Sequence, residues 1–213
     1  MVTKLVRAAL IALATLGAAS LAKAAVLDQE NLLNADGSGM LFYVSDPGMS
    51  WQQSLTAGIE GRLERVEFLT DRADGSIVFF VDKGTPWQSD PHAFSSTVDV
   101  AASVVGQFYG NAGPWWVSVD VSAAGIDLDA GDAFVLGFKG TGTQLGLYGT
   151  SGNLYPGSLF FEQVLSDGQI IGPIEYEEYD FSMRTFMNPV PEPHTIAMLL
   201  AGLGVIGLAT RRR

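Results

Sequence analysis

Few residues in this chain could carry nucleophilic or acid–base chemistry. The sequence has no cysteine and two histidines, His92 and His194. A serine hydrolase needs a histidine to take the proton of its nucleophile, and no Gly-x-Ser-x-Gly elbow surrounds any serine. The usual zinc sites need more histidine or cysteine than the chain offers. We therefore predict that His92 is an ordinary loop residue, that no metal site is present and that the protein is not an enzyme.

Carboxylates, in contrast, are abundant, and paired carboxylates can hydrolyse glycosidic bonds. Residues 25–190 hold 22 acidic and six basic residues, a net charge of −16. With so many acids some pairs lie at a workable separation by chance, so the pattern identifies no catalytic pair. The cluster Glu175, Glu177, Glu178 and Asp180 is most simply a solvated loop before the last strand. A secreted glycan-active hydrolase is kept as an alternative hypothesis.

The aspartates at 127, 129 and 132 could turn oxygens toward one calcium ion. An EF-hand loop has glycine at its sixth position and glutamate at its twelfth, whereas this segment has Asp132 and Phe138 there. We expect an aspartate-rich turn before a strand at 133–139. No cofactor is predicted, and calcium binding in another geometry is left open.

Two adjacent tryptophans offer the best binding hypothesis. In a strand, the rings of Trp115 and Trp116 must point to opposite faces of the sheet. Flat aromatic rings pack well on sugar rings, so an outward-facing tryptophan is a candidate glycan contact. The alternative is that both rings are covered by packing, because tryptophan is highly buried on average. Trp51 and Trp87 have the same status.

The elements that must position these residues are short strands. Gly is abundant at 25 residues, no long amphipathic helical pattern is present, and turn residues separate the apolar runs. Several runs alternate with the two-residue period of a half-buried strand. Eight strands are predicted, at residues 63–70, 76–81, 97–105, 115–121, 133–139, 144–148, 159–164 and 179–186. The predicted fold class is all-β, a β-sandwich or jelly roll in two sheets, over residues 25–188.

The charge of this body limits its partners. A strongly negative domain repels phosphate backbones, so no nucleic-acid binding is expected. The absence of cysteine does not identify the compartment. A body of this size buries enough apolar surface to fold without disulfides.

The first 24 residues have the layout of a secretory signal peptide. Lys4 and Arg7 precede an apolar stretch at 8–21, and Ala22 and Ala24 supply the small residues that a signal peptidase reads. Cleavage is expected after Ala24, with Ala25 as the alternative. The secretion translocase and signal peptidase are therefore expected partners.

The last 25 residues form a second candidate targeting segment. Val190, Pro191, Glu192 and Pro193 precede an apolar run at 196–209, which predicts a single transmembrane helix at 195–210. The prolines break regular structure. Arg211, Arg212 and Arg213 then resist translocation, so an exported chain stalls with its tail in the inner membrane.

This order of Pro-Glu-Pro, apolar helix and arginine cluster resembles the PEP-CTERM sorting signal, which is also catalogued as an ice-binding-protein C-terminal domain. The resemblance covers residues 189–213 and implies sorting alone, with no ice-binding activity. It implies that an exosortase, a membrane-embedded cysteine transpeptidase, recognises the tail and removes it near the Pro-Glu-Pro. It also implies a Gram-negative cell that produces exopolysaccharide.

The body is similar, more loosely, to galactose-binding-like jelly-roll modules of secreted bacterial proteins. The segments that carry this likeness are 53–58 with 63–68, 126–134, and 155–161 with 180–186. A shared sandwich does not fix a ligand. Together the sequence predicts a non-enzymatic protein at the cell surface or in the extracellular matrix that associates with polysaccharide. A purely structural matrix or adhesion protein is the second alternative.

Overall fold

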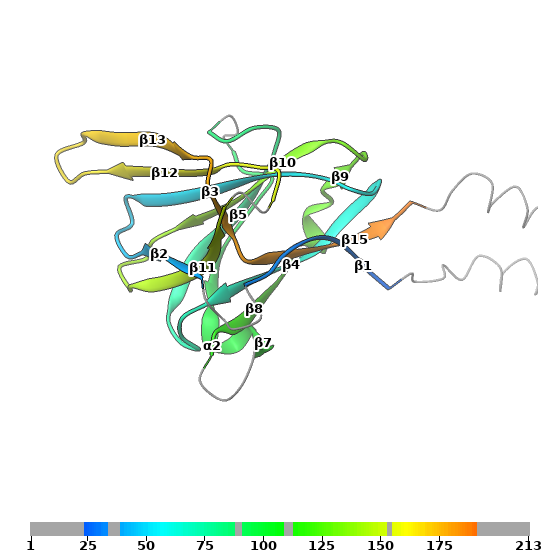
Figure 1. The fold of residues 1–213 in the computed structure, drawn as a ribbon, viewed down its shortest axis with the longest axis horizontal. Helices are drawn as coiled ribbons and strands as arrows, with labels where there is room; N and C mark the ends of the chain where they lie inside the picture. Colours follow the sequence, from blue (N-terminus) through cyan, green and yellow to red (C-terminus); the bar gives the residue numbers. More distant parts are fainter. Residues whose placement is uncertain (1–23, 34–38, 88–90, 109–112, 153–154, 191–213) are drawn as a thin grey trace, which may run out of the picture.

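The computed structural model describes residues 24–33, 39–87, 91–108, 113–152 and 155–190 (Figure 1). The predicted signal peptide, the Pro-Glu-Pro motif, the helix at 195–210 and the arginines at 211–213 lie outside the described residues, apart from Ala24 and Val190.

The described chain is built almost entirely of β-strands. In chain order its elements are β1 (Val26–Asn31), β2 (Met40–Val44), β3 (Met49–Thr56), β4 (Gly61–Thr70), β5 (Ser76–Lys83), β6 (Phe94–Asp99), α2 (Val100–Ser103), β7 (Val104–Gln107), β8 (Trp115–Asp120), the 3-10 turn η1 (Ser122–Ala124), β9 (Asp127–Leu128), β10 (Ala133–Lys139), β11 (Leu145–Ser151), β12 (Leu159–Val164), β13 (Ile170–Tyr176), β14 (Tyr179–Phe181) and β15 (Met183–Pro189).

The strands form two antiparallel sheets. The larger sheet runs β1-β15-β4-β11-β14, with β8 and β9 also paired to β4, β7 paired to β8, and β2 paired to β11. The smaller sheet has the order β13-β12-β3-β10-β5-β6. The prediction of an all-β fold in two sheets is confirmed.

The hydrophobic core lies between the two sheets. The Phe68 ring of the larger sheet contacts Phe79 and Phe138 of the smaller one, with ring centroids 5.8 Å and 4.9 Å apart. Phe138 also meets Phe181 of β14 edge to face at 5.1 Å. These rings are almost completely buried, so aromatic packing joins the sheets and supplies much of the hydrophobic stabilisation.

Two predicted strands are divided in the structure. The run at 97–105 breaks at Asp99, whose side chain accepts hydrogen bonds from the N–H groups of Ala101 and Ala102 and so caps the short helix α2. The run at 179–186 breaks at Ser182, where the chain passes from pairing with β11 to pairing with β4. Neither single-strand prediction is correct.

Five strands, β1, β2, β3, β9 and β13, were not predicted. The strand β3 shows why, because the polar side chains of Gln52 and Gln53 are both almost fully buried, on opposite faces of the smaller sheet. The Gln53 amide donates to Asp180 at 3.1 Å, and its carbonyl accepts from the Phe181 N–H at 3.0 Å. Tertiary hydrogen bonds thus make a polar sequence suitable for a central strand.

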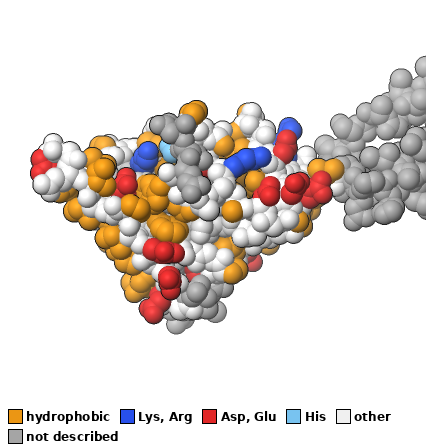
Figure 2. All heavy atoms as spheres, turned by 90° about the horizontal axis from the view of Figure 1, so that it is seen from above, with side chains coloured by type: hydrophobic (Ala, Val, Ile, Leu, Met, Phe, Trp, Pro, Cys, Tyr) orange, Lys and Arg blue, Asp and Glu red, His pale blue; other side chains and the backbone are white. Residues whose placement is uncertain are grey.

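The β12–β13 hairpin projects from one end of the molecule, opposite the end where β1 begins and β15 ends (Figure 1). It exposes Val164, Ile170, Ile171 and Ile174. Figure 2 shows hydrophobic side chains gathered toward this end.

Gly137 tests how closely the outer face of the smaller sheet is packed. It pairs with Phe80 across β10 and β5, and a Cβ atom at Gly137 would overlap the Phe80 ring. We expect Gly137→Ala to lower the free energy of unfolding by about 1–3 kcal/mol through overpacking. The measurement is urea denaturation of the mature protein.

Gly106→Ala is the matched control, because a Cβ atom there meets nothing within 4 Å. Equal stability of the two variants would contradict the close packing of Phe80 over Gly137.

Candidate functional site

A groove lies on the outer face of the larger sheet, where β4, β7, β8 and β15 meet. Its volume is about 470 Å³, within the range of small-molecule sites. The lining residues are Glu67, Val105, Gly106, Gln107, Phe108, Trp116 and Arg184.

Strand register places the polar residues of the groove in one row. Arg184 of β15 is the partner of Glu30 in β1 on one side and of Glu67 in β4 on the other. Glu67 in turn faces Ser118 of β8. Since side chains directly opposite one another share a face, four strands contribute to one cross-strand ladder.

Ion pairs hold this ladder together. The Arg184 Nε atom lies 2.7 Å from Glu30 Oε1, and its Nη1 lies 3.7 Å from Glu67 Oε2. Arg65 approaches the other oxygen of Glu67 at 3.4 Å, and its guanidinium stands over the Phe186 ring, 3.9 Å from the centroid. Glu67 is 7% exposed, so its carboxylate is held between two cations with little freedom to move.

Trp116 forms an aromatic wall of the groove. The Arg184 guanidinium carbon lies 4.3 Å from its ring centroid, and Leu69 and Phe108 pack beside it in a second, smaller apolar cluster. Trp116 is 6% exposed, so its ring supports Arg184 from below and leaves little of itself open to the groove.

Trp115 lies on the opposite face of β8 from Trp116, because successive side chains of a strand point to opposite faces of the sheet. It is half-buried, and its ring packs so closely over Gly113 that a Cβ atom there would overlap it. Trp115 does not line the groove. Of the two tryptophans named as candidate glycan contacts, the structure brings Trp116 alone to this site.

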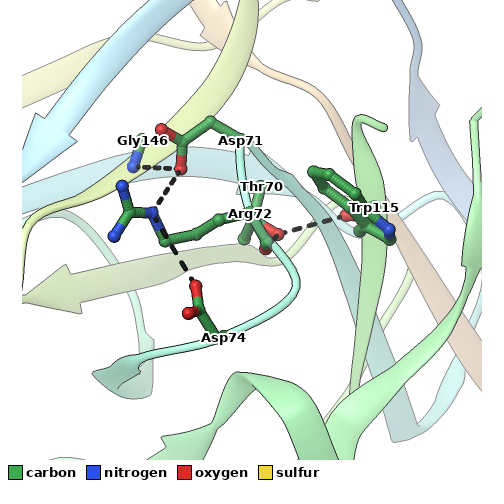
Figure 3. A network of polar contacts seen from close by, with 6 residues as sticks. All are labelled: Thr70, Asp71, Arg72, Asp74, Trp115 and Gly146. Carbon is green, nitrogen blue, oxygen red and sulfur yellow. Dashed lines mark hydrogen bonds and ion pairs between the residues drawn. The ribbon is translucent and has the colours of Figure 1, made fainter. Parts of the chain in front are cut away.

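A polar network at the end of β4 fixes the strand ends that carry the tryptophans (Figure 3). The Thr70 hydroxyl donates to the carbonyl of Arg72 at 2.8 Å and lies 3.4 Å from that of Trp115. The N–H of Gly146 donates to Asp71 Oδ1 at 2.8 Å. Arg72 lies between Asp71 and Asp74. The network joins β4, β8 and β11 and so aligns β8 with the groove.

His92 belongs to a different face. Its Nδ1 atom lies 2.9 Å from Asp82 Oδ2, and its ring stacks on Phe80 with centroids 4.1 Å apart. Asp82 is 4% exposed and also accepts a hydrogen bond from the Ala93 N–H. The predicted loop residue is thus tied to a buried carboxylate of β5.

The aspartates at 127–132 take different partners. Asp127 pairs with Arg62 at 2.9 Å, and this hydrogen bond lowers the pKa of Asp127. Asp132 Oδ2 accepts from the Asp129 N–H at 3.0 Å, closing a turn just before β10. In the part of the chain that the structure describes, no three acidic or histidine side chains are placed to hold one metal ion.

The acidic cluster at 175–180 is not a uniform solvated loop. Glu175, Glu177 and Glu178 are exposed, on β13 and the turn that follows it. Asp180 is fully buried in β14, where it accepts hydrogen bonds from the Gln53 amide and the Tyr155 N–H, both at 3.1 Å. The expectation is wrong for Asp180, because tertiary packing covers a residue that charge patterning assigned to the surface.

The sequence analysis did not identify the charged residues in and beside the groove as site residues. Arg65, Glu67 and Arg184 lie in predicted strands, but their cross-strand neighbours come from distant parts of the sequence. The alternation of Arg65 and Glu67 on one face of β4 was the available signal.

The C-terminal end of the described chain remains paired to the sheet. Pro189 of β15 is opposite Gly61 of β4, and the N–H of Val190 donates to the carbonyl of Glu60 at 3.3 Å. Val190 itself is 53% exposed. The Pro-Glu-Pro begins at the next residue.

Comparison with known proteins decides what this segment is similar to. Residues 189–213 match the PEP-CTERM protein-sorting motif. The resemblance found in the sequence is thereby confirmed, and no curated protein matches the chain. A PEP-CTERM motif implies an exported protein that is anchored in the membrane before an exosortase processes it. No helix within the described ranges is long and apolar enough to cross a membrane.

Asp180 provides a test of the buried network. Asp180→Ala removes the buried carboxylate that accepts from the Gln53 amide and the Tyr155 N–H, so we expect the free energy of unfolding to fall by about 3 kcal/mol. The measurement is chemical denaturation followed by tryptophan fluorescence.

Glu178→Ala, in the exposed turn two residues earlier, is the control and should change stability by less than about 0.5 kcal/mol. A loss of similar size in both variants would contradict the burial of Asp180.

Proposed function

We propose that this protein is a non-enzymatic jelly-roll module that an exosortase delivers to the cell surface or extracellular matrix, where its outer-face groove binds polysaccharide. The sorting motif supports the delivery. The groove of Glu67, Trp116 and Arg184 supports the binding and is the observation on which the proposal depends. The producing cell is proposed to be Gram-negative and to make exopolysaccharide.

The chemistry of the groove favours sugar hydroxyls. Carboxylate and guanidinium groups fixed by ion pairs present acceptors and donors in set directions, and the exposed Val105 beside them offers an apolar surface to a sugar ring. Arg184 pairs with Glu30 and Glu67, and Arg65 pairs with Glu67, so two cations balance the two carboxylates. A neutral sugar segment therefore fits better than a strongly anionic one.

The engagement of both carboxylates supports a binding module over a hydrolase. Glycoside hydrolysis needs one carboxyl group to donate a proton and another to act as base or nucleophile. Glu30 and Glu67 are instead committed to guanidinium groups. A purely structural matrix protein, the other alternative, predicts no saturable sugar binding.

Val105 offers a test that spares the fold, because it lines the groove and is 60% exposed. We expect Val105→Lys to weaken binding to exopolysaccharide from the native host by about tenfold, since a bulky charge enters the groove. The measurement is affinity electrophoresis of the mature protein in gels containing that polysaccharide.

Val164→Lys on β12 is the matched control, with the same substitution at an exposed valine of the other sheet. Wild-type retardation of the Val105 variant would exclude the groove as the binding site. Retardation of none of the three proteins would favour the purely structural alternative.

Sorting is tested by the intact mass of the protein recovered from the native host, compared with a strain that lacks the exosortase. We expect a wild-type mass that ends near Pro191–Pro193 and an unprocessed tail in the mutant strain. A tail that extends to Arg213 in both strains would mean that the C-terminus is a permanent anchor.

A further inference from the structure

The inner face of the β12–β13 hairpin carries a row of apolar side chains. Phe161 of β12 packs on the core residue Trp51, with ring centroids 4.6 Å apart, and so identifies the face that looks toward the core. Ile174 of β13 is directly opposite Phe161, and Tyr176 follows two residues later on the same face. Tyr176 also approaches Trp51, at 5.7 Å.

Ile171 belongs to the same face. Its cross-strand partner is Gln163, which lies two residues after Phe161 in a stretch of β12 that pairs with β3 without interruption. Side chains two residues apart in a strand share a face, so Gln163 and Ile171 lie on the side of Phe161. We call Phe161, Ile171, Ile174 and Tyr176 the hairpin patch.

The hairpin patch continues the core to the surface of the molecule. Phe161 and Tyr176 are half-buried and pack against the main core cluster. Ile171 and Ile174 are 43% and 40% exposed, in a hairpin that projects from the body (Figure 1). Neighbouring apolar side chains that remain exposed on one face commonly mark a contact surface.

The charge around the hairpin patch has one sign. The sequence has no lysine, arginine or histidine between Lys139 and Arg184, a stretch that holds six acidic residues. Four of these are exposed in β13 and in the turns on either side of it, namely Asp167, Glu175, Glu177 and Glu178. Figure 2 shows acidic and hydrophobic side chains together at this end of the molecule. An apolar face with a negative rim is complementary to a surface that combines apolar and cationic side chains.

A second copy of this chain fits the hairpin patch poorly. Two hairpins brought together would set their carboxylates against one another, and like charges across an interface are costly. Extension of the sheet is also disfavoured at this edge. Pro173 of the edge strand β13 has no N–H to donate, and the register of β12 with β13 shifts beside it. A partner therefore uses the side chains of the patch.

We propose that the hairpin patch binds a basic amphipathic segment of another protein. The apolar side chains of that segment lie on Ile171 and Ile174, and its lysines and arginines lie toward Glu175 and Glu177. The proposal goes beyond polysaccharide binding. The patch belongs to the smaller sheet and the groove to the larger one, so neither depends on the ligand of the other.

The test uses a synthetic helical peptide with leucines on one face and lysines on the other, titrated into the mature protein by isothermal calorimetry. We expect saturable binding with one peptide per protein. Ile171→Ser with Ile174→Ser should weaken binding about tenfold, because the apolar part of the contact is lost while the charge of the protein is unchanged. Val26→Ser with Val105→Ser is the matched control, at exposed apolar positions of the larger sheet, and should bind as the wild type does.

The charged rim is tested separately, with variants that leave the apolar side chains in place. Glu175→Gln with Glu177→Gln should also weaken binding about tenfold at low salt and should reduce its salt dependence. Glu60→Gln with Asp129→Asn removes the same charge at exposed positions elsewhere and should bind within about twofold of the wild type.

Equal affinity of the wild-type protein and the Ile171 and Ile174 variant would overturn the proposal. Equal binding of a peptide with glutamates in place of its lysines would overturn it as well. A dimer of the mature protein that the same variant dissociates would assign the hairpin patch to a second copy instead. Loss of polysaccharide retardation in that variant would assign the patch to a glycan, whereas retention would leave both proposals standing.

Discussion

The antiparallel pairing of β15 with β4 is the interaction on which the rest of the structure depends. It joins the last strand of the body to the strand that also pairs with β8, β9 and β11. Because β15 lies inside the sheet between β1 and β4, the body is complete only when the chain as far as Pro189 is in place. The fold thus extends to the edge of the sorting motif.

The same pairing creates the groove and fixes the end of the described chain. On its outer face it sets Arg184 between Glu30 and Glu67, beside the Trp116 ring. At its end it holds Val190 against Glu60. The groove and the fixed position of Val190 therefore follow from one strand register, in which residues 183–187 of β15 are paired on both sides.

Buried polar groups give the sandwich its specific arrangement. The core aromatics would pack in many ways, but Gln53 and Asp180 satisfy their hydrogen bonds only when β3 lies beneath β14. Leaving such groups unpaired is costly, which favours a single relative placement of the two sheets. This constraint also explains why a strand as polar as β3 can occupy a central position.

The sequence alone identified the sorting motif and the all-β class, and it predicts a secretory leader, because all three are patterns among neighbouring residues. It located β10 and β12 at their observed bounds. It missed β3 and the burial of Asp180, and it could not assemble Glu67, Trp116 and Arg184 into a groove. Those features depend on contacts between residues more than a hundred positions apart, such as Glu67 with Arg184, and only the tertiary structure decides such pairings.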